Sequence, residues 1–196
     1  RQYNWLGRNS GEFIIMAIDK IQAESMNLAD TFAFTGTVSG ASGAALNIDN
    51  YFHAQDQKSS NTDGGTLTGG SFITRVFNTV LTNTISGASL ASNQVTLPSG
   101  TYYVWGRAPT VGTARTKTIL YNATDSSNIL IGTSDDANGN YATQTDGSVV
   151  GKFVLGAEKA IELRQQGVTV SGKGLGEGSG YGVVEVYAEI QIWKVA

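Results

Sequence analysis

The stretch VEVYAEIQIW, residues 184–193, alternates between aliphatic side chains and polar or aromatic ones along its whole length. Successive side chains of a β-strand point to opposite faces of the sheet, so this alternation predicts a strand. One face of the strand is expected to lie on the core, and it carries Val184, Val186, Ala188, Ile190 and Ile192. The other face carries Glu185, Tyr187, Glu189, Gln191 and Trp193.

Working back from this strand, the same period of two recurs in several shorter stretches. Further strands are predicted at Thr101–Ala108, Thr113–Asn122, Ser148–Leu155 and Lys159–Gln165. The turn signal Pro98-Ser99-Gly100 precedes the first of them, and loops are predicted at Thr133–Gly147 and Ser171–Gly182. Many short strands without helices between them predict a mainly β fold, an antiparallel sandwich or barrel, over residues 72–196.

The N-terminal part has a different period. Ser10 is a suitable helix cap, and the spacing of Ile14, Ile18, Ile21, Ser25 and Leu28 is that of a heptad seam. Isoleucine at both seam positions favours three-stranded coiled coils, so residues 1–30 are predicted to form a helical stalk that brings three copies together. The alternative is an amphipathic helix packed on its own domain. Residues 31–71, which are rich in glycine and polar side chains, are expected to be a connector with loops.

Composition excludes several classes of function. The net charge is −3 and no basic stripe is present, so binding to nucleic acid is not expected. No apolar run is long enough for membrane insertion, and the absence of cysteine rules out thiol nucleophiles and cysteine zinc sites. His53 is the only histidine, and no G-x-S-x-G elbow accompanies it. Glu185 and Glu189 would lie about 13 Å apart along a strand, too far for a glycosidase pair. We therefore expect no enzymatic activity.

One stretch resembles the start of a calcium loop. It runs from Asp135 to Asn140, but its glycine is misplaced, and Gly147 stands where such a loop has a glutamate. Asn138-Gly139 is better explained as a hairpin turn. No cofactor is expected, and calcium is kept only as a minor alternative.

Aromatic and charged residues share the faces of two strands that point away from the predicted core. Such mixtures are typical of protein–protein contacts rather than of solvated surfaces. The alternative is that a loop from residues 36–71 covers this face. The predicted subunit interface consists of Tyr103, Trp105, Arg107, Tyr187, Glu189 and Trp193.

The stretch ISGASLASNQVTLPSGTYYVWGRAP, Ile85–Pro109, resembles the strand–turn–strand signature of C1q/TNF-like jelly rolls. The ordered motifs RVFNTV, VTLPSGTYYV, ILYNATD, IGTSD, G-x-F-V-L-x-A-E-K-x-I-E-L and EVYAEIQIWKV resemble, more specifically, a C-terminal domain of bacteriophage tail fibres and related virion proteins. This resemblance covers about Phe72–Val195. It implies a homotrimeric jelly-roll knob on the surface of a phage particle that is assembled in the host cytoplasm.

The resemblance also implies partners. These are further copies of the chain, a bacterial surface polysaccharide or protein receptor, and other virion proteins bound through the N-terminal side. Candidate ligand-binding residues, chosen for expected exposure and for chemistry that suits sugars, are Tyr51, Phe52, Asn138, Asn140 and Tyr141. The alternatives are a capsid decoration or head-fibre protein without host contact, and a secreted signalling trimer.

Overall fold

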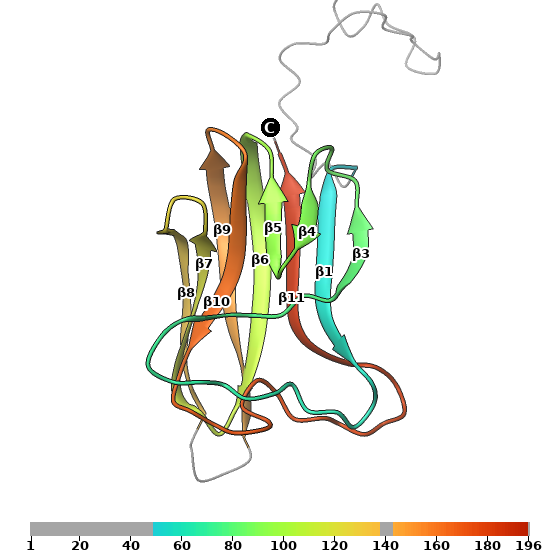
Figure 1. The fold of residues 1–196 in the computed structure, drawn as a ribbon, viewed down its shortest axis with the longest axis vertical. Coiled ribbons are helices and arrows are strands. Elements are labelled where there is room, and N and C mark those ends of the chain that lie inside the picture. Colours follow the sequence, from blue (N-terminus) through green and yellow to red (C-terminus); the bar gives the residue numbers. More distant parts are fainter. Residues whose placement is uncertain (1–48, 138–142, 196) are drawn as a thin grey trace, which may run out of the picture. The chain divides into compact units, whose positions relative to one another are not determined.

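The computed structural model describes residues 49–137 and 143–195, and this part of the chain consists of antiparallel strands joined by turns and loops (Figure 1). The predicted stalk helix, with Ile14, Ile18, Ile21 and Leu28, lies outside the described residues. The strands are β1 (Tyr51–Lys58), β2 (Ile73–Thr74), β3 (Thr79–Asn83), β4 (Ser89–Ala91), β5 (Gln94–Leu97), β6 (Gly100–Val111), β7 (Ala114–Asn122), β8 (Ser127–Ala137), β9 (Gln144–Leu155), β10 (Lys159–Gln166) and β11 (Glu185–Lys194).

These strands form two sheets packed face to face. The five-stranded sheet has the order β3-β1-β11-β6-β9, and the six-stranded sheet has the order β4-β5-β10-β7-β8, with β2 added beside β10. The pairings in both sheets are antiparallel. The first and last strands lie side by side, which is the arrangement of a jelly-roll sandwich. The predicted fold class is confirmed for the part of the chain that the structure describes.

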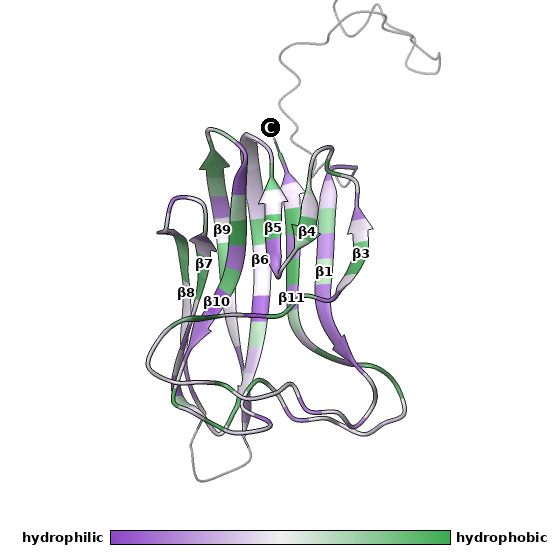
Figure 2. Ribbon diagram, in the orientation of Figure 1, coloured by the Kyte–Doolittle hydropathy of each residue, from purple (hydrophilic) through white to green (hydrophobic). Residues whose placement is uncertain are grey.

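Alternation of side chains builds the core, as the sequence predicts. Bands of hydrophobic and hydrophilic residues alternate along the strands (Figure 2). On β6, Tyr102, Val104 and Ala108 are buried, and on β11, Ile190 and Ile192 meet them from the neighbouring strand. The inward residues of both sheets join in one apolar cluster. Burying such side chains stabilises the sandwich by about 1.5–3 kcal/mol each.

The interior becomes polar toward one end of the strands. The inward positions of β1, β6, β10 and β11 are apolar over most of their length, and toward one end these four strands and β7 each place a buried polar residue. These residues are Asp56, Thr110, Thr118, Gln165 and Glu185. Arg75, which follows β2, is buried among them and donates hydrogen bonds to Gln165 Oε1 at 2.7 Å and to the carbonyl of Pro109 at 2.9 Å.

The structure differs from the sequence prediction in two segments. Strand β1 lies inside residues 31–71, which we expected to be a connector, and it places Phe52 and Ala54 in the core. Strands β8 and β9 extend into the predicted loop Thr133–Gly147, up to Ala137 and from Gln144. Their side chains there are mostly polar and exposed, so polarity alone does not distinguish these strand ends from a loop.

Strand β11 also differs from a regular strand. Residues Gln55 and Gln57 of β1 pair with Glu189 and Val186, so β11 holds an extra residue at this point. Such a β-bulge changes which side chains face inward. Glu185 and Tyr187 are therefore buried, while Val184 is exposed, opposite to the predicted faces at this end of the strand.

The two ends of the sandwich hold different parts of the chain. The chain enters β1 and leaves β11 at one end, where the Lys194 amide donates to the Asn50 carbonyl at 3.0 Å. The long β1–β2 and β10–β11 connections lie at the opposite end, at the bottom of Figure 1. We call this the loop end. The end of β8 and the start of β9 also lie here, because Ala137 and Gln144 pair with the residues on either side of the β6–β7 turn.

Candidate functional site

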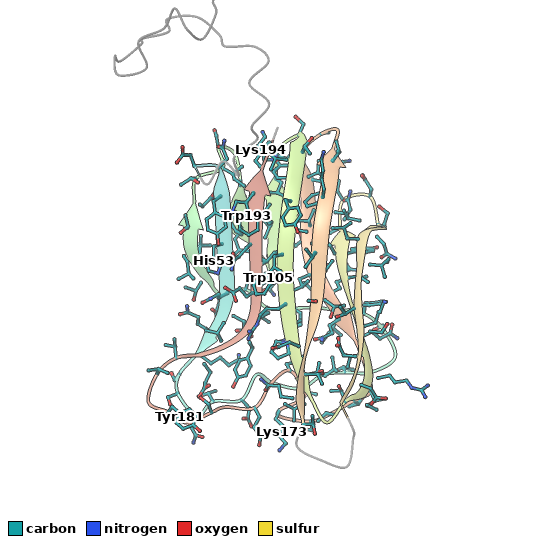
Figure 3. The ribbon with its side chains drawn as sticks, turned by 180° about the vertical axis from the view of Figure 1, so that it is seen from behind. His53, Trp105, Lys173, Tyr181, Trp193 and Lys194 are labelled. Carbon is teal, nitrogen blue, oxygen red and sulfur yellow. The ribbon has the colours of Figure 1, made fainter. Side chains whose placement is uncertain are left out.

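The outward face of the five-stranded sheet carries a regular array of aromatic and polar side chains. Three neighbouring strands contribute three rows that are aligned by the strand register. The rows, each from β1 through β11 to β6, are Tyr51–Trp193–Tyr103, His53–Gln191–Trp105 and Gln55–Glu189–Arg107. We call these nine residues the open face. In Figure 3, where His53, Trp105 and Trp193 are labelled, no other strand or loop of the described residues lies over it.

The first row is aromatic. The Trp193 ring lies between the two tyrosines, with ring centroids 5.1 Å from Tyr51 and 6.1 Å from Tyr103. Aromatic pairs at such spacings attract each other and hold their rings in place. Tyr103 nevertheless remains exposed. The result is a fixed apolar surface next to the chain entry.

The lower rows hold a compact polar cluster around Glu189. Its Oε1 atom lies 2.6 Å from His53 Nε2 and accepts hydrogen bonds from Gln55 at 3.0 Å and Gln191 at 3.3 Å. Burial raises the pKa of the Glu189 carboxyl group, but these hydrogen bonds together outweigh burial and bring its pKa below the usual value. The cluster therefore presents a charge that is already satisfied within the chain.

Arg107 completes this corner of the open face. Its guanidinium lies 3.8 Å from Asp146, and its Nε atom is buried without a hydrogen-bond partner among the described residues. A buried donor without a partner is rare in folded proteins. Arg107 thus retains hydrogen-bonding capacity on the open face.

The predicted interface residues are largely brought together. Tyr103, Trp105, Arg107, Glu189 and Trp193 all lie on the open face. Tyr187 does not, and its assignment to this face is wrong. It is only 2% exposed and its hydroxyl donates to the Thr62 carbonyl at 2.6 Å, because the bulge in β11 turns it inward. The same array also contains four residues that were not predicted to belong to it: Tyr51, His53, Gln55 and Gln191.

Of the predicted ligand-binding residues, the structure describes Tyr51 and Phe52. Phe52 is fully buried in the core, because it occupies an inward position of β1, so its assignment as an exposed ligand-binding residue is wrong. Tyr51 lies on the open face at the end where the chain enters. Asn138, Asn140 and Tyr141 lie outside the described residues.

Two carboxylates of the strands, Glu162 and Glu189, have separate partners. Glu162 lies in the six-stranded sheet, bound to Thr74, Gln94 and Arg164, while Glu189 belongs to the five-stranded sheet. Within residues 49–137 and 143–195, no three His, Asp or Glu side chains gather as potential metal ligands. The same residues include no helix with the length and apolarity of a membrane span.

Neither a protein-family model nor a curated protein matches this sequence. Among solved structures, murine APRIL at pH 8.0 aligns with a TM-score of 0.44 and 10% identity over 72% of this chain and 96% of its own. The globular domain of zebrafish complement 1qA protein gives 0.45 and 15% over 75% and 97%. Eiger TNF from S. frugiperda gives 0.49 and 12% over 74% and 92%. These proteins are TNF- and C1q-type jelly-roll domains.

Proposed function

We propose that this chain is a homotrimeric knob of a bacteriophage fibre, in which three copies meet through the open face and the loop end contacts the host cell surface. The observation that carries the proposal is the open face itself. It places four tyrosine and tryptophan rings, an arginine and a hydrogen-bonded His–Glu pair on a sheet that no other described element covers.

The chemistry of the open face suits burial against a second copy. Tyr, Trp and Arg are the residues most enriched at the centres of protein interfaces. The Glu189 carboxylate already has hydrogen-bond partners within the chain, so burying it would not leave it without partners. Arg107 Nε offers a donor that a neighbouring copy could satisfy. A solvated outer face would instead carry lysine, serine and threonine.

The chain enters the sandwich at the end opposite the long loops, and this arrangement supports a position at the tip of a fibre. The N-terminal residues reach β1 at one end of the sandwich, and the long loops lie at the other, so a fibre joined through the N-terminal side would carry those loops outward. The resemblance of six ordered motifs to bacteriophage fibre domains supports location on a virion. The proposed role is binding rather than catalysis.

A particle decoration without host contact is the second candidate. It would use the same open face for assembly, and the sequence motifs fit it equally well, since the resemblance extends to head fibres. The two candidates differ only in what the loop end does.

The first experiment is the solution mass of the full chain. We expect three times the chain mass of 20.6 kDa, and Trp105→Ala should lower the mass toward that of one copy. Tyr121→Ala, on the outer side of the six-stranded sheet, is the matched control and should leave the trimer intact. A monomeric wild-type protein would refute the trimer. Adsorption of the purified trimer to bacterial cells then separates the fibre tip from the decoration, which should not adsorb.

A further inference from the structure

The two long connections at the loop end pair with each other rather than running separately. Gly64 donates to the Gly176 carbonyl at 2.8 Å, and Leu175 donates to the Gly65 carbonyl at 3.0 Å. A further bridge joins Leu67 to Val170. The β1–β2 and β10–β11 connections therefore form one surface, built from segments about a hundred residues apart in sequence.

Tyr181 stands out from this surface. It is 86% exposed, the highest exposure among the large hydrophobic residues of the described chain, and it is labelled at the bottom of Figure 3. Val183 and Val184 beside it are also exposed. A tyrosine ring in water with apolar neighbours contributes nothing to the core, and exposed apolar clusters commonly mark interaction sites.

The backbone that carries Tyr181 is held on both sides. The Glu185 carboxylate accepts hydrogen bonds from the amides of Asn61, Ser179 and Gly180 at 2.9–3.0 Å. On the other side, Gly182 donates to Ser60 Oγ at 2.9 Å. The two glycines that flank Tyr181 have φ angles of +70° and +80°, which glycine adopts at little cost. The ring is thus presented from a fixed turn.

Polar groups of the β1–β2 connection lie next to this turn. The Asn61 Oδ1 atom lies 3.3 Å from the position that a Cβ on Gly180 would take, and the Ser60 hydroxyl adjoins Gly182. A Cβ on Gly182 would meet nothing within 4 Å, so the space on that side of Tyr181 is open. The turn that carries Tyr181 thus adjoins a carboxamide and a hydroxyl, so the exposed ring and these hydrogen-bonding groups lie on the same part of the loop end.

We infer that Tyr181, with Asn61 and Ser60, forms a saccharide-binding site at the loop end. A sugar ring offers an apolar C–H face to the tyrosine and hydroxyl groups to the amide and the serine. Because the Tyr181 ring is exposed rather than enclosed, a single copy binds weakly, and three copies on one knob raise the overall avidity by about 10²–10⁴-fold. The inference rests on the proposed function, of which it names the receptor-binding residues and the class of ligand.

The test uses the full-length trimer on an array of bacterial capsular and O-antigen polysaccharides and on the corresponding cells. Tyr181→Ala and Tyr181→Leu should each lower binding at least about tenfold, as expected for truncating a central aromatic contact. Tyr181→Phe keeps the ring and should retain most of the binding. Val168→Ala removes another exposed side chain from the β10–β11 connection and serves as the control. Because Tyr181 is so exposed, its variants should fold and form trimers normally.

The outcomes separate the two proposals. If the wild-type protein binds and the Ala and Leu variants bind equally well, the Tyr181 site is refuted while the fibre-tip function stands. Binding to cells that survives periodate oxidation of glycans but is lost after protease treatment would identify a protein receptor and overturn the saccharide inference. A trimer that binds no polysaccharide and no cell in the panel refutes the receptor-binding function, and the site with it.

Discussion

Arg75 provides the sharpest test of how the loop end is held. Its guanidinium is 1% exposed and donates to Gln165 Oε1, to the Pro109 carbonyl and to the Leu175 carbonyl at 2.7, 2.9 and 3.0 Å. These acceptors belong to β10, β6 and the β10–β11 connection. Burial lowers the pKa of Arg75 to about 10, which still leaves it charged at neutral pH.

The replacement Arg75→Met keeps an apolar side chain of similar length and removes the three donors. Each acceptor left buried without a partner costs about 1–3 kcal/mol. The variant no longer buries a charged group, and the saved desolvation free energy offsets part of this loss. Measured losses of stability on breaking buried charged networks are about 3–5 kcal/mol. We expect a loss in this range, a large part of the roughly 5–15 kcal/mol by which domains are stable.

The assay is urea unfolding at one fixed protein concentration, followed by tryptophan fluorescence. With a slope of about 2 kcal/mol per molar, the midpoint should fall by about 2 M urea. Arg115→Met, at an exposed position of β7, is the matched control and should change the midpoint little. A midpoint for Arg75→Met that stays within about 0.5 M of the wild type would refute the reasoning, because it would mean that the three hydrogen bonds add no net stability.

Three further predictions follow from local contacts. Hydrogen bonds from the Asn61, Gly180 and Ser179 amides lower the pKa of Glu185 to about 2, below its usual 4.5, so its stabilising effect is present above about pH 4.5 and is lost as pH falls toward 2. Glu185→Gln should therefore melt below the wild type at pH 7, and this difference should vanish near pH 2; a constant difference would contradict it. Gly176→Ala should lower the melting temperature, because φ is +130° and the new Cβ would lie 2.1 Å from Tyr187 Cδ1; an unchanged melting temperature would contradict the clash. Tyr102→Phe removes the hydroxyl that donates to the Pro98 carbonyl at 2.7 Å and should cost about 1 kcal/mol in urea unfolding, and no loss would show that water replaces this bond.

Much of the sandwich could be predicted because its central strands bury only one face. Alternation marks such strands directly, and it located β6, β7, β10 and most of β11. Strand β1 was missed because its inward positions are Phe52, Ala54 and Asp56, and a polar inward residue breaks the pattern. The bulge in β11 could not be predicted from this strand alone, since it arises in the pairing with Gln55 and Gln57.

The candidate interface, too, could be predicted from the sequence only in part. Tyr103, Trp105 and Trp193 are prominent because aromatic residues on an outward face are unusual for a monomer. No such signal marks His53. Its part in the open face depends on its contact with Glu189 at 2.6 Å, and Glu189 is more than a hundred residues away in sequence. Its segment also showed no clear period, so nothing local connected it with the last strand. Recognising His53 would have required the pairing of β1 with β11.

The change from an apolar to a polar interior explains how a glycine-rich surface can be held in one shape. Apolar contacts are strong but non-directional, so the core can hold the sheets together without fixing a loop that has few side chains to bury. Hydrogen bonds are directional, and at the loop end they join side chains near the strands to the backbone of the loops. Arg75 donates to the Leu175 carbonyl. The Glu185 carboxylate accepts hydrogen bonds from backbone amides of both long connections, those of Asn61 and Gly180. These hydrogen bonds therefore hold the turn that carries Tyr181 in a fixed position relative to the sheets. Substitutions at Tyr181 should then change binding without changing stability, whereas substitutions at Glu185 should loosen the turn and weaken binding while Tyr181 itself is intact.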